Sequence, residues 1–130
     1  MSSSRKRNDF LELDEARVFL ESSLYFVSAW NEDMLVGIGR LGGDGRVTVE
    51  ITDVVVKSDY YRRGIGTEIV SRLVSFIDEA DPYFVQVSPV GEQEVRLYEK
   101  FGFVVMPDYI KMERGTRKLR EKIGGVRNRK

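Results

Sequence analysis

The chain of 130 residues contains no cysteine and no histidine. Without cysteine it can form no disulfide, no thiolate zinc site and no cysteine nucleophile. Without histidine, a Ser-His-Asp triad and a histidine general base are excluded as well. With histidine absent, we take as candidate bases the carboxylates, or a water molecule that carboxylates hold in place.

The sequence also has no apolar run long enough to span a bilayer, and its first residues lack the apolar stretch of a secretion signal. We therefore expect a cytoplasmic protein that makes no contact with membranes. The formal net charge is zero, but the charges are unevenly placed. Residues 1–7 carry three cations, and residues 114–130 carry eight cations against one acid. Between positions 8 and 113 there are ten basic and twenty acidic residues, so the body of the protein is expected to be acidic.

The most informative stretch is residues 54–76. It begins with three valines that suit the end of a buried strand, and it continues through Arg62-Arg63-Gly64-Ile65-Gly66. From residue 65 the apolar residues recur with a period of about 3.6, which predicts a helix over residues 65–80. The apolar stripe of this helix consists of Ile65, Ile69, Val70, Leu73, Phe76 and Ile77.

A strand, a glycine-containing turn and a helix in succession can hold a phosphate. The first N–H groups of a helix have no helical acceptor, and they lie at the positive end of the macrodipole. Gly64 and Gly66 would leave these groups open, and Arg62 and Arg63 add positive charge beside them. The alternative is that the glycines only permit a tight turn and the arginines are solvated. The stretch is neither a dinucleotide G-x-G-x-x-G, because Ile69 occupies the last position, nor a P-loop.

Two blocks of the sequence resemble the GNAT superfamily of acyl-CoA-dependent N-acetyltransferases. V-x-x-x-Y-x-R-R-G-I-G-T resembles motif A, Gln/Arg-x-x-Gly-x-Gly/Ala, with Gly64 and Gly66 at the glycine positions and Tyr61 in place of the usual Gln or Arg. L-Y-E-K-F-G-F, residues 97–103, resembles motif B, L-Y-x-K-x-G-F. Family members often carry Asn-x-x-Ala before this block, and here those positions are Gly91 and Glu94. The resemblance covers about residues 10–112.

This resemblance implies acetyl-CoA as cosubstrate and no metal. It implies that the pantetheine arm runs beside the end of the strand before the turn, where a backbone N–H would donate to the thioester oxygen. The cofactor-binding residues that follow are Val54, Val55, Val56, Tyr61, Arg62, Arg63, Gly64, Ile65, Gly66 and Thr67.

The resemblance also implies that Tyr98, the tyrosine of motif B, is the acid that protonates the departing thiolate. A phenol with a pKa of about 10 is well matched to that task. The alternative is packing, because Tyr98 shares the apolar face of its predicted helix with Val95 and Phe101.

For the base, the candidates are Glu50, slightly preferred, and Asp53, each of which has a strand or turn contact as its alternative. Strand alternation places these two carboxylates on opposite faces, so both reach one site only if a β-bulge interrupts the strand.

The predicted elements describe an α/β (α+β) fold with a mixed, mostly antiparallel sheet and helices on both faces. A helix is expected over residues 10–20, strands over residues 24–30, 34–41 and 46–56, a strand over 83–87 after the long helix, and a helix over 92–101. A final strand pair is expected over 103–106 and 109–113. The strand–helix–strand unit implies a parallel pair, which the resemblance places at the centre of the sheet, splayed apart.

We expect a disordered N-terminus over residues 1–8, one domain over residues 9–113 and a basic tail over residues 114–130. The acidic body suggests a cationic acceptor, such as a primary amine, a polyamine or a lysine side chain. Because no peptide-binding extension is visible, a small cationic primary amine is preferred to a protein acceptor, and the family resemblance allows a homodimer. The alternative function is a non-catalytic acyl-CoA-binding module that acts through its tail on nucleic acid or an acidic protein. No aromatic residue interrupts the basic tail, so a base-stacking surface is not indicated.

Overall fold

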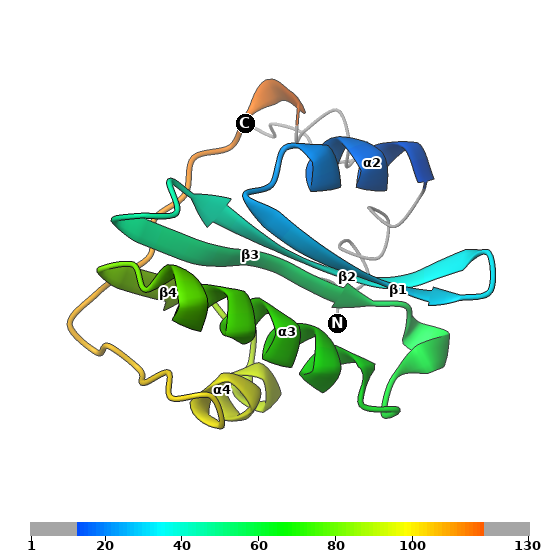
Figure 1. Ribbon diagram of the computed structural model, residues 1–130. Coiled ribbons are helices and arrows are strands. Elements are labelled where there is room, and N and C mark those ends of the chain that lie inside the picture. Colours follow the sequence, from blue (N-terminus) through cyan, green and yellow to red (C-terminus); the bar gives the residue numbers. More distant parts are fainter. Residues whose placement is uncertain (1–12, 119–130) are drawn as a thin grey trace, which may run out of the picture.

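The computed structural model describes residues 13–118 and shows a four-stranded sheet with helices on both faces (Figure 1). Helix α2 (Leu13–Glu21) lies on one face of the sheet. Helices α3 (Ile65–Ala80) and α4 (Glu92–Glu99) lie on the other. This arrangement confirms the predicted fold class.

The strands follow each other in space as they do in the sequence. They are β1 (Tyr25–Asn31), β2 (Met34–Gly43), β3 (Thr48–Val56) and β4 (Phe84–Val87). The first three form an antiparallel meander, and β4 returns through α3 to pair parallel with β3. The predicted parallel pair is thus present, but at the edge of the described sheet and not at its centre, because β4 is the last described strand.

Helix α3 packs against the sheet through the apolar stripe that the sequence predicts. Its buried residues are Ile69, Val70, Leu73 and Ile77. The helix approaches β2 closely at Gly39, where a Cβ would lie 2.3 Å from Cγ2 of Ile69. Glycine at this position therefore allows the helix to lie directly on the sheet.

A β-bulge interrupts β3 at Thr52. Arg40 of β2 pairs with Asp53, and the next residue, Leu41, pairs with Ile51, so Thr52 is the extra residue. Before the bulge, Ile51 packs in the core on the α3 side; after it, Val55 packs in the cluster that Leu20 of α2 covers. The bulge therefore shifts the alternation of the strand by one residue.

Helix α2 is fixed to the sheet by one arginine as well as by apolar packing. The Arg40 side chain donates from Nε to Oδ2 of Asp53 over 2.8 Å, and from Nη1 to the carbonyl oxygen of Phe19 over 2.8 Å. The same guanidinium lies 5.3 Å from the centroid of the Phe19 ring. Arg40 thereby joins β2, β3 and α2.

The predicted final strand pair is wrong. Residues 103–113 form no strand and run past the β4 side of the sheet with most of their apolar side chains exposed (Figure 1). Phe103 directs this course: its N–H donates to the carbonyl oxygen of Tyr98 over 3.3 Å, and its ring meets the Tyr98 ring edge-on. β-forming side chains need a neighbouring strand, and these residues have none in the described part of the chain.

The expected disordered N-terminus, residues 1–8, lies outside the described residues, as do positions 119–130 of the expected basic tail. The first five residues of that tail, 114–118, are exposed. Within residues 13–118, no helix is both long enough and apolar enough to cross a membrane.

Candidate active site

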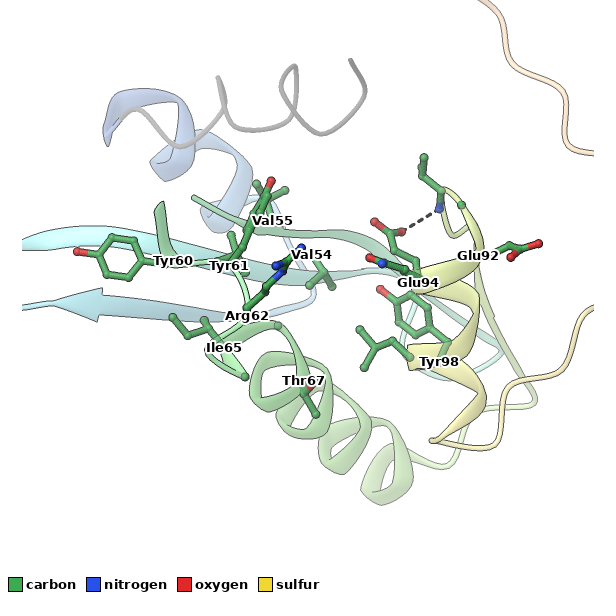
Figure 2. A pocket seen from close by; sticks show the side chains of 17 residues that line it. Val54, Val55, Tyr60, Tyr61, Arg62, Ile65, Thr67, Glu92, Glu94 and Tyr98 are labelled. Atoms are coloured by element: carbon green, nitrogen blue, oxygen red, sulfur yellow. Dashed lines mark hydrogen bonds between the residues drawn. The ribbon is translucent and has the colours of Figure 1, made fainter. Parts of the chain in front are cut away.

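A pocket of about 700 Å³ opens where β3 continues beyond β4 (Figure 2). The last pair between these strands joins Ile51 to Val87, whereas β3 extends to Val56. The pocket occupies the space beside this unpaired end of β3, with the start of α3 on one side and α4 on the other. The pocket therefore lies where β4 ends and β3 continues without a partner on that side.

One end of the pocket is formed by the first turn of α3. Gly64 is the N-cap residue, with φ of +80°, and no side chain caps the helix. The first helical hydrogen bond in this turn runs from the N–H of Glu68 to the carbonyl oxygen of Gly64 over 3.0 Å. The N–H groups of residues 65–67 precede that bond, so they have no helical acceptor and lie at the positive end of the helix dipole. This turn can bind an anion.

The two arginines of the motif lie in different places. Arg62 lines the pocket and holds a φ of +66°, which is uncommon for a residue with a Cβ. Arg63 does not line it; its guanidinium lies 4.8 Å from the centroid of the Tyr60 ring. Glu68, the acid in the first turn of α3, pairs with Arg72 over 2.8 Å, one turn further along the helix. The positive charge beside the anion-binding turn therefore comes from Arg62 and the helix end.

The end of β3 offers main-chain groups to the pocket. The N–H of Lys57 donates to the carbonyl oxygen of Val36 in β2 over 2.8 Å. Because peptide groups alternate in direction along an antiparallel strand, those of Val54 and Val56 point away from β2, toward the pocket. Val54, Val55 and Val56 all line it.

Tyr98 forms the opposite wall, as Figure 2 shows. Its side chain is only 4% exposed, and its ring meets the ring of Phe103 at 5.6 Å and 72°. It also lines a small recess next to the main pocket, together with Asp53 and Glu94. Tyr98 is thus both a core residue and a pocket residue.

The two candidate bases lie on the same face of the sheet, because the bulge at Thr52 shifts the alternation of the strand between them. Asp53 borders the small recess and is held by the ion pair with Arg40. Glu50 lines neither cavity; it stands in register with Gln86, in the paired part of β3. The structure therefore brings the anion-binding turn and Tyr98 together and leaves Glu50 outside the pocket.

Sequence reasoning missed the contribution of the first turn of α4. The pocket is also lined by Tyr60, Val90, Gly91, Glu92, Gln93, Glu94 and Leu97. The Glu94 carboxylate accepts a hydrogen bond from the N–H of Val90 over 2.8 Å and so closes the turn before the helix (Figure 2). Gly91, with φ of +86°, was the available signal for this turn.

The residues present fit the diphosphate and pantetheine parts of acetyl-CoA. Gly66 and Val56 both line the pocket, and a Cβ at Gly66 would lie 3.9 Å from Cγ2 of Val56, so a side chain at position 66 would occupy space on the pocket side of this turn. An open helix end beside Arg62 suits the diphosphate, and an unpaired strand edge suits an amide-containing chain. Within residues 13–118, no three acidic side chains gather as a metal ion would require.

The comparisons with known proteins agree with this geometry. A family model described as the acetyltransferase (GNAT) family matches residues 2–103. A curated relative, the uncharacterized N-acetyltransferase ycf52 of Pyropia yezoensis, is 26% identical over 104 residues. That match covers 76% of this chain and 59% of the relative, so the chain spans less than two thirds of the relative's length.

Solved structures share the fold. The GNAT family acetyltransferase SP0256 from Streptococcus pneumoniae TIGR4 is 30% identical, with 80% of each chain covered and a TM-score of 0.67. SA2161 from meticillin-resistant Staphylococcus aureus, described as a protein of unknown function and probable acetyltransferase, is 27% identical, with 79% of each chain covered and a TM-score of 0.68. A GNAT family acetyltransferase from Elizabethkingia anophelis, solved with acetyl-CoA bound, is 18% identical and has a TM-score of 0.58 over 73% of this chain and 63% of its own.

Proposed function

Because the chain belongs to the GNAT acetyltransferase family, we propose that it transfers an acetyl group from acetyl-CoA directly to a primary amine, with a small cationic amine as acceptor. The observation that carries this proposal is that one pocket joins an open helix N-terminus to a buried tyrosine across an unpaired strand end. The chain has no cysteine, so a thioester-linked acetyl-enzyme cannot form.

The first task of the pocket is to hold the cosubstrate. The amides at the start of α3, together with Arg62, would bind the diphosphate. The outward peptide groups of Val54 and Val56 would pair with the pantetheine amides and donate to the thioester oxygen. Acetyl-CoA supplies the acetyl group as a thioester; the chain supplies the position and the hydrogen bonds.

The second task is proton transfer. When the amine nitrogen bonds to the acetyl carbon and the carbon–sulfur bond breaks, the Tyr98 hydroxyl would give its proton to the leaving sulfur. The attacking nitrogen must lose its proton to a carboxylate or to a water molecule. Glu50 is our candidate to order that water, because Asp53 is already paired with Arg40.

A cationic acceptor is supported by the charges on the α4 side of the pocket. Glu94 lines it there, opposite the end formed by Arg62 and α3, whereas the Glu92 side chain points away from the pocket and lies 3.7 Å from Arg96 (Figure 2). An anionic cosubstrate would therefore be bound at one end, and a positively charged amine would be attracted to the other.

The proposal is tested by measuring acetyl-CoA binding with a thermal shift assay, for the wild type beside Gly66→Ala. Residue 66 lies within α3, so alanine should raise the free energy of unfolding by roughly 0.5–1 kcal/mol. Its methyl group would enter the pocket near Val56 and weaken binding. We therefore expect a more stable protein with a smaller ligand-induced shift, whereas the wild type should gain about 2.7 kcal/mol at about 100 times its Kd.

Gly64→Ala provides the contrast. Residue 64 has a φ of +80°, and a Cβ there would have no heavy atom within 4 Å, so alanine should strain the backbone without touching the core. A wild type without any shift would contradict the cosubstrate assignment. Full binding by Gly66→Ala would contradict the assignment of the diphosphate to this turn. Binding without turnover on any amine would favour the acyl-CoA-binding alternative.

A further inference from the structure

The ring of Tyr60 is held in place at the end of the pocket where α3 begins. Tyr60 is the last residue of the 3₁₀ turn Ser58–Tyr60, and its half-buried side chain lines the pocket (Figure 2). Its hydroxyl accepts a hydrogen bond from Nδ2 of Asn31, the last residue of β1, over 2.7 Å. The Arg63 guanidinium lies over the ring, 4.8 Å from its centroid. The end of β1 and the turn before α3 therefore both hold this ring.

The neighbouring tyrosine is not held in this way. Tyr61 also lines the pocket, but it is 45% exposed, and its side chain forms no hydrogen bond or ring contact with other residues of the described chain. A ring that is already fixed loses little conformational freedom when a ligand stacks on it, whereas a free ring must first be ordered. Tyr60 is therefore the better platform for a planar group.

The charges around Tyr60 favour an anionic ligand over a cationic one. Arg63 lies over the ring, and Arg62 lines the same pocket. Within residues 13–118, no carboxylate pairs with either arginine. A positively charged amine would be repelled here, and the guanidinium of Arg63 already makes the cation–π contact that such an amine could offer. The ring is therefore suited to a neutral planar group that belongs to an anionic ligand.

The order of the groups along acetyl-CoA matches the order of the residues along the pocket. The proposed function, on which this inference rests, places the thioester near Tyr98 and the diphosphate at the start of α3. In acetyl-CoA the adenosine follows the diphosphate, and Figure 2 shows Tyr60 and Tyr98 at opposite ends of the pocket with Arg62 between them. We propose that Tyr60 stacks on the adenine ring of acetyl-CoA, and that Asn31 and Arg63 position the tyrosine for this contact. Tyr60 would then distinguish coenzyme A from a shorter pantetheine thioester.

The test compares two acetyl donors by isothermal titration calorimetry, without an acceptor. S-acetyl-4′-phosphopantetheine lacks the adenosine of acetyl-CoA but keeps the thioester, the pantetheine arm and one phosphate. We expect Tyr60→Leu to weaken acetyl-CoA binding at least about 5-fold, the lower end of what base stacking on an aromatic ring contributes. The Kd of the shorter donor should stay within about 2-fold of the wild-type value, which also shows that the variant is folded. Tyr83→Leu is the matched control: Tyr83 is 82% exposed and lies outside the pocket, so this variant should bind both donors as the wild type does.

A fluorescence measurement tests the stacking in the wild type itself. The probe is etheno-CoA, whose modified adenine is fluorescent and is quenched when it stacks on an aromatic ring. We expect quenching on binding to the wild type and its loss in Tyr60→Leu at saturating protein. A bound probe that stays unquenched, an unchanged acetyl-CoA affinity in Tyr60→Leu, or an equal loss for both donors would each overturn the stacking and leave the cosubstrate assignment intact. A wild type that binds neither donor would instead contradict the proposed function, and this inference with it.

Discussion

Tyr98 is held by the core on one side and borders the pocket on the other. Its ring packs beside Phe103 among the buried residues that α3 and the sheet form. A buried ring has few accessible rotamers, so the hydroxyl is held in place before any ligand binds. At the scale of the single residue, packing is therefore what would give the tyrosine a defined catalytic position.

We expect Tyr98→Phe to lower turnover by about 100-fold or more, because the leaving sulfur would lose its proton donor. Acetyl-CoA affinity should stay close to that of the wild type, since the ring is kept. Steady-state kinetics and thermal shift measure the two quantities. Tyr83→Phe serves as the control, because Tyr83 is exposed and lies outside the pocket. Unchanged turnover in Tyr98→Phe would remove this residue from the mechanism.

The two carboxylates of β3 can be separated by their amide variants. Asp53→Asn takes the negative charge from the partner of the mostly buried Arg40 and should cost about 1–3 kcal/mol of stability, with turnover per folded molecule nearly kept. Glu50→Gln should keep the stability and lose about 100-fold in turnover. Chemical denaturation and initial rates distinguish them. The reverse pattern would make Asp53 the base.

Among the elements, the turn between β2 and β3 depends on one side chain. Oδ1 of Asp44 accepts hydrogen bonds from the N–H groups of Arg46, Val47 and Thr48. These bonds favour the carboxylate and lower the pKa of Asp44 below its ordinary value of 3.8. The turn sets the start of β3, and through it the register of the strand that borders the pocket.

The sign of the pH effect follows from that lowered pKa. The contribution of Asp44 to the free energy of unfolding is fully present at pH values above the ordinary pKa of 3.8. It is lost as the pH falls through the lowered pKa of the folded protein. Asp44→Asn should therefore lower the melting temperature at neutral pH and approach the wild type in acid. Thermal unfolding across a pH series measures both. A difference between the two proteins that does not vary with pH would show that charge has no part in the turn.

Elements whose structure is set by residues close in the sequence could be predicted, whereas features that depend on pairing with a distant strand could not. The bounds of α3 and its buried stripe followed from apolar spacing alone. The bulge at Thr52 could not be predicted, because it arises from pairing with β2. The final strands failed for the same reason: β propensity says that a segment suits a sheet, not that an edge is within reach.

The same distinction applies to the residues of the candidate site. Contiguous groups, such as the turn at residues 61–67, could be read from the sequence because their geometry is set by neighbours in the chain. The first turn of α4 was missed, because its position depends on contacts between elements. Arg63 was expected to border the pocket, but its guanidinium lies over the ring of Tyr60, three residues earlier. Glu50 was preferred as the base from its strand position together with the family resemblance; it lines neither cavity, so it would act through an ordered water molecule.

At the scale of the whole molecule, the formal net charge is zero, but the charges are unevenly distributed along the sequence. Positions 8–113 carry twice as many acidic as basic residues, and the cations gather toward both ends of the sequence. A negative body raises the local concentration of cations around it, and salt weakens this effect. The charge of the acceptor should thus influence the rate at a distance from the pocket.

We expect an amine panel to show this dependence. For acceptors of similar size, kcat/KM should rise from neutral to singly and doubly charged amines, and the advantage should shrink as salt is raised from about 0.01 to about 0.15 M. Rates are measured at a fixed, saturating acetyl-CoA concentration, so that differences in kcat/KM reflect the acceptor alone. Preference for neutral or anionic amines would contradict a cationic acceptor.

The extra residue in β3 also bears on how the chain can tolerate a change in length. Ile51 and Asp53, on either side of Thr52, pair with adjacent residues of β2. Deletion of Thr52 would therefore leave every other pair of the two strands in place. Ile51 would still point toward α3, and Asp53 would still reach Arg40. Elsewhere in a regular strand, the loss of one residue turns all those beyond it to the opposite face. The sheet should therefore absorb a shortening most easily at position 52, and the strand end beside the pocket would become straighter as a result.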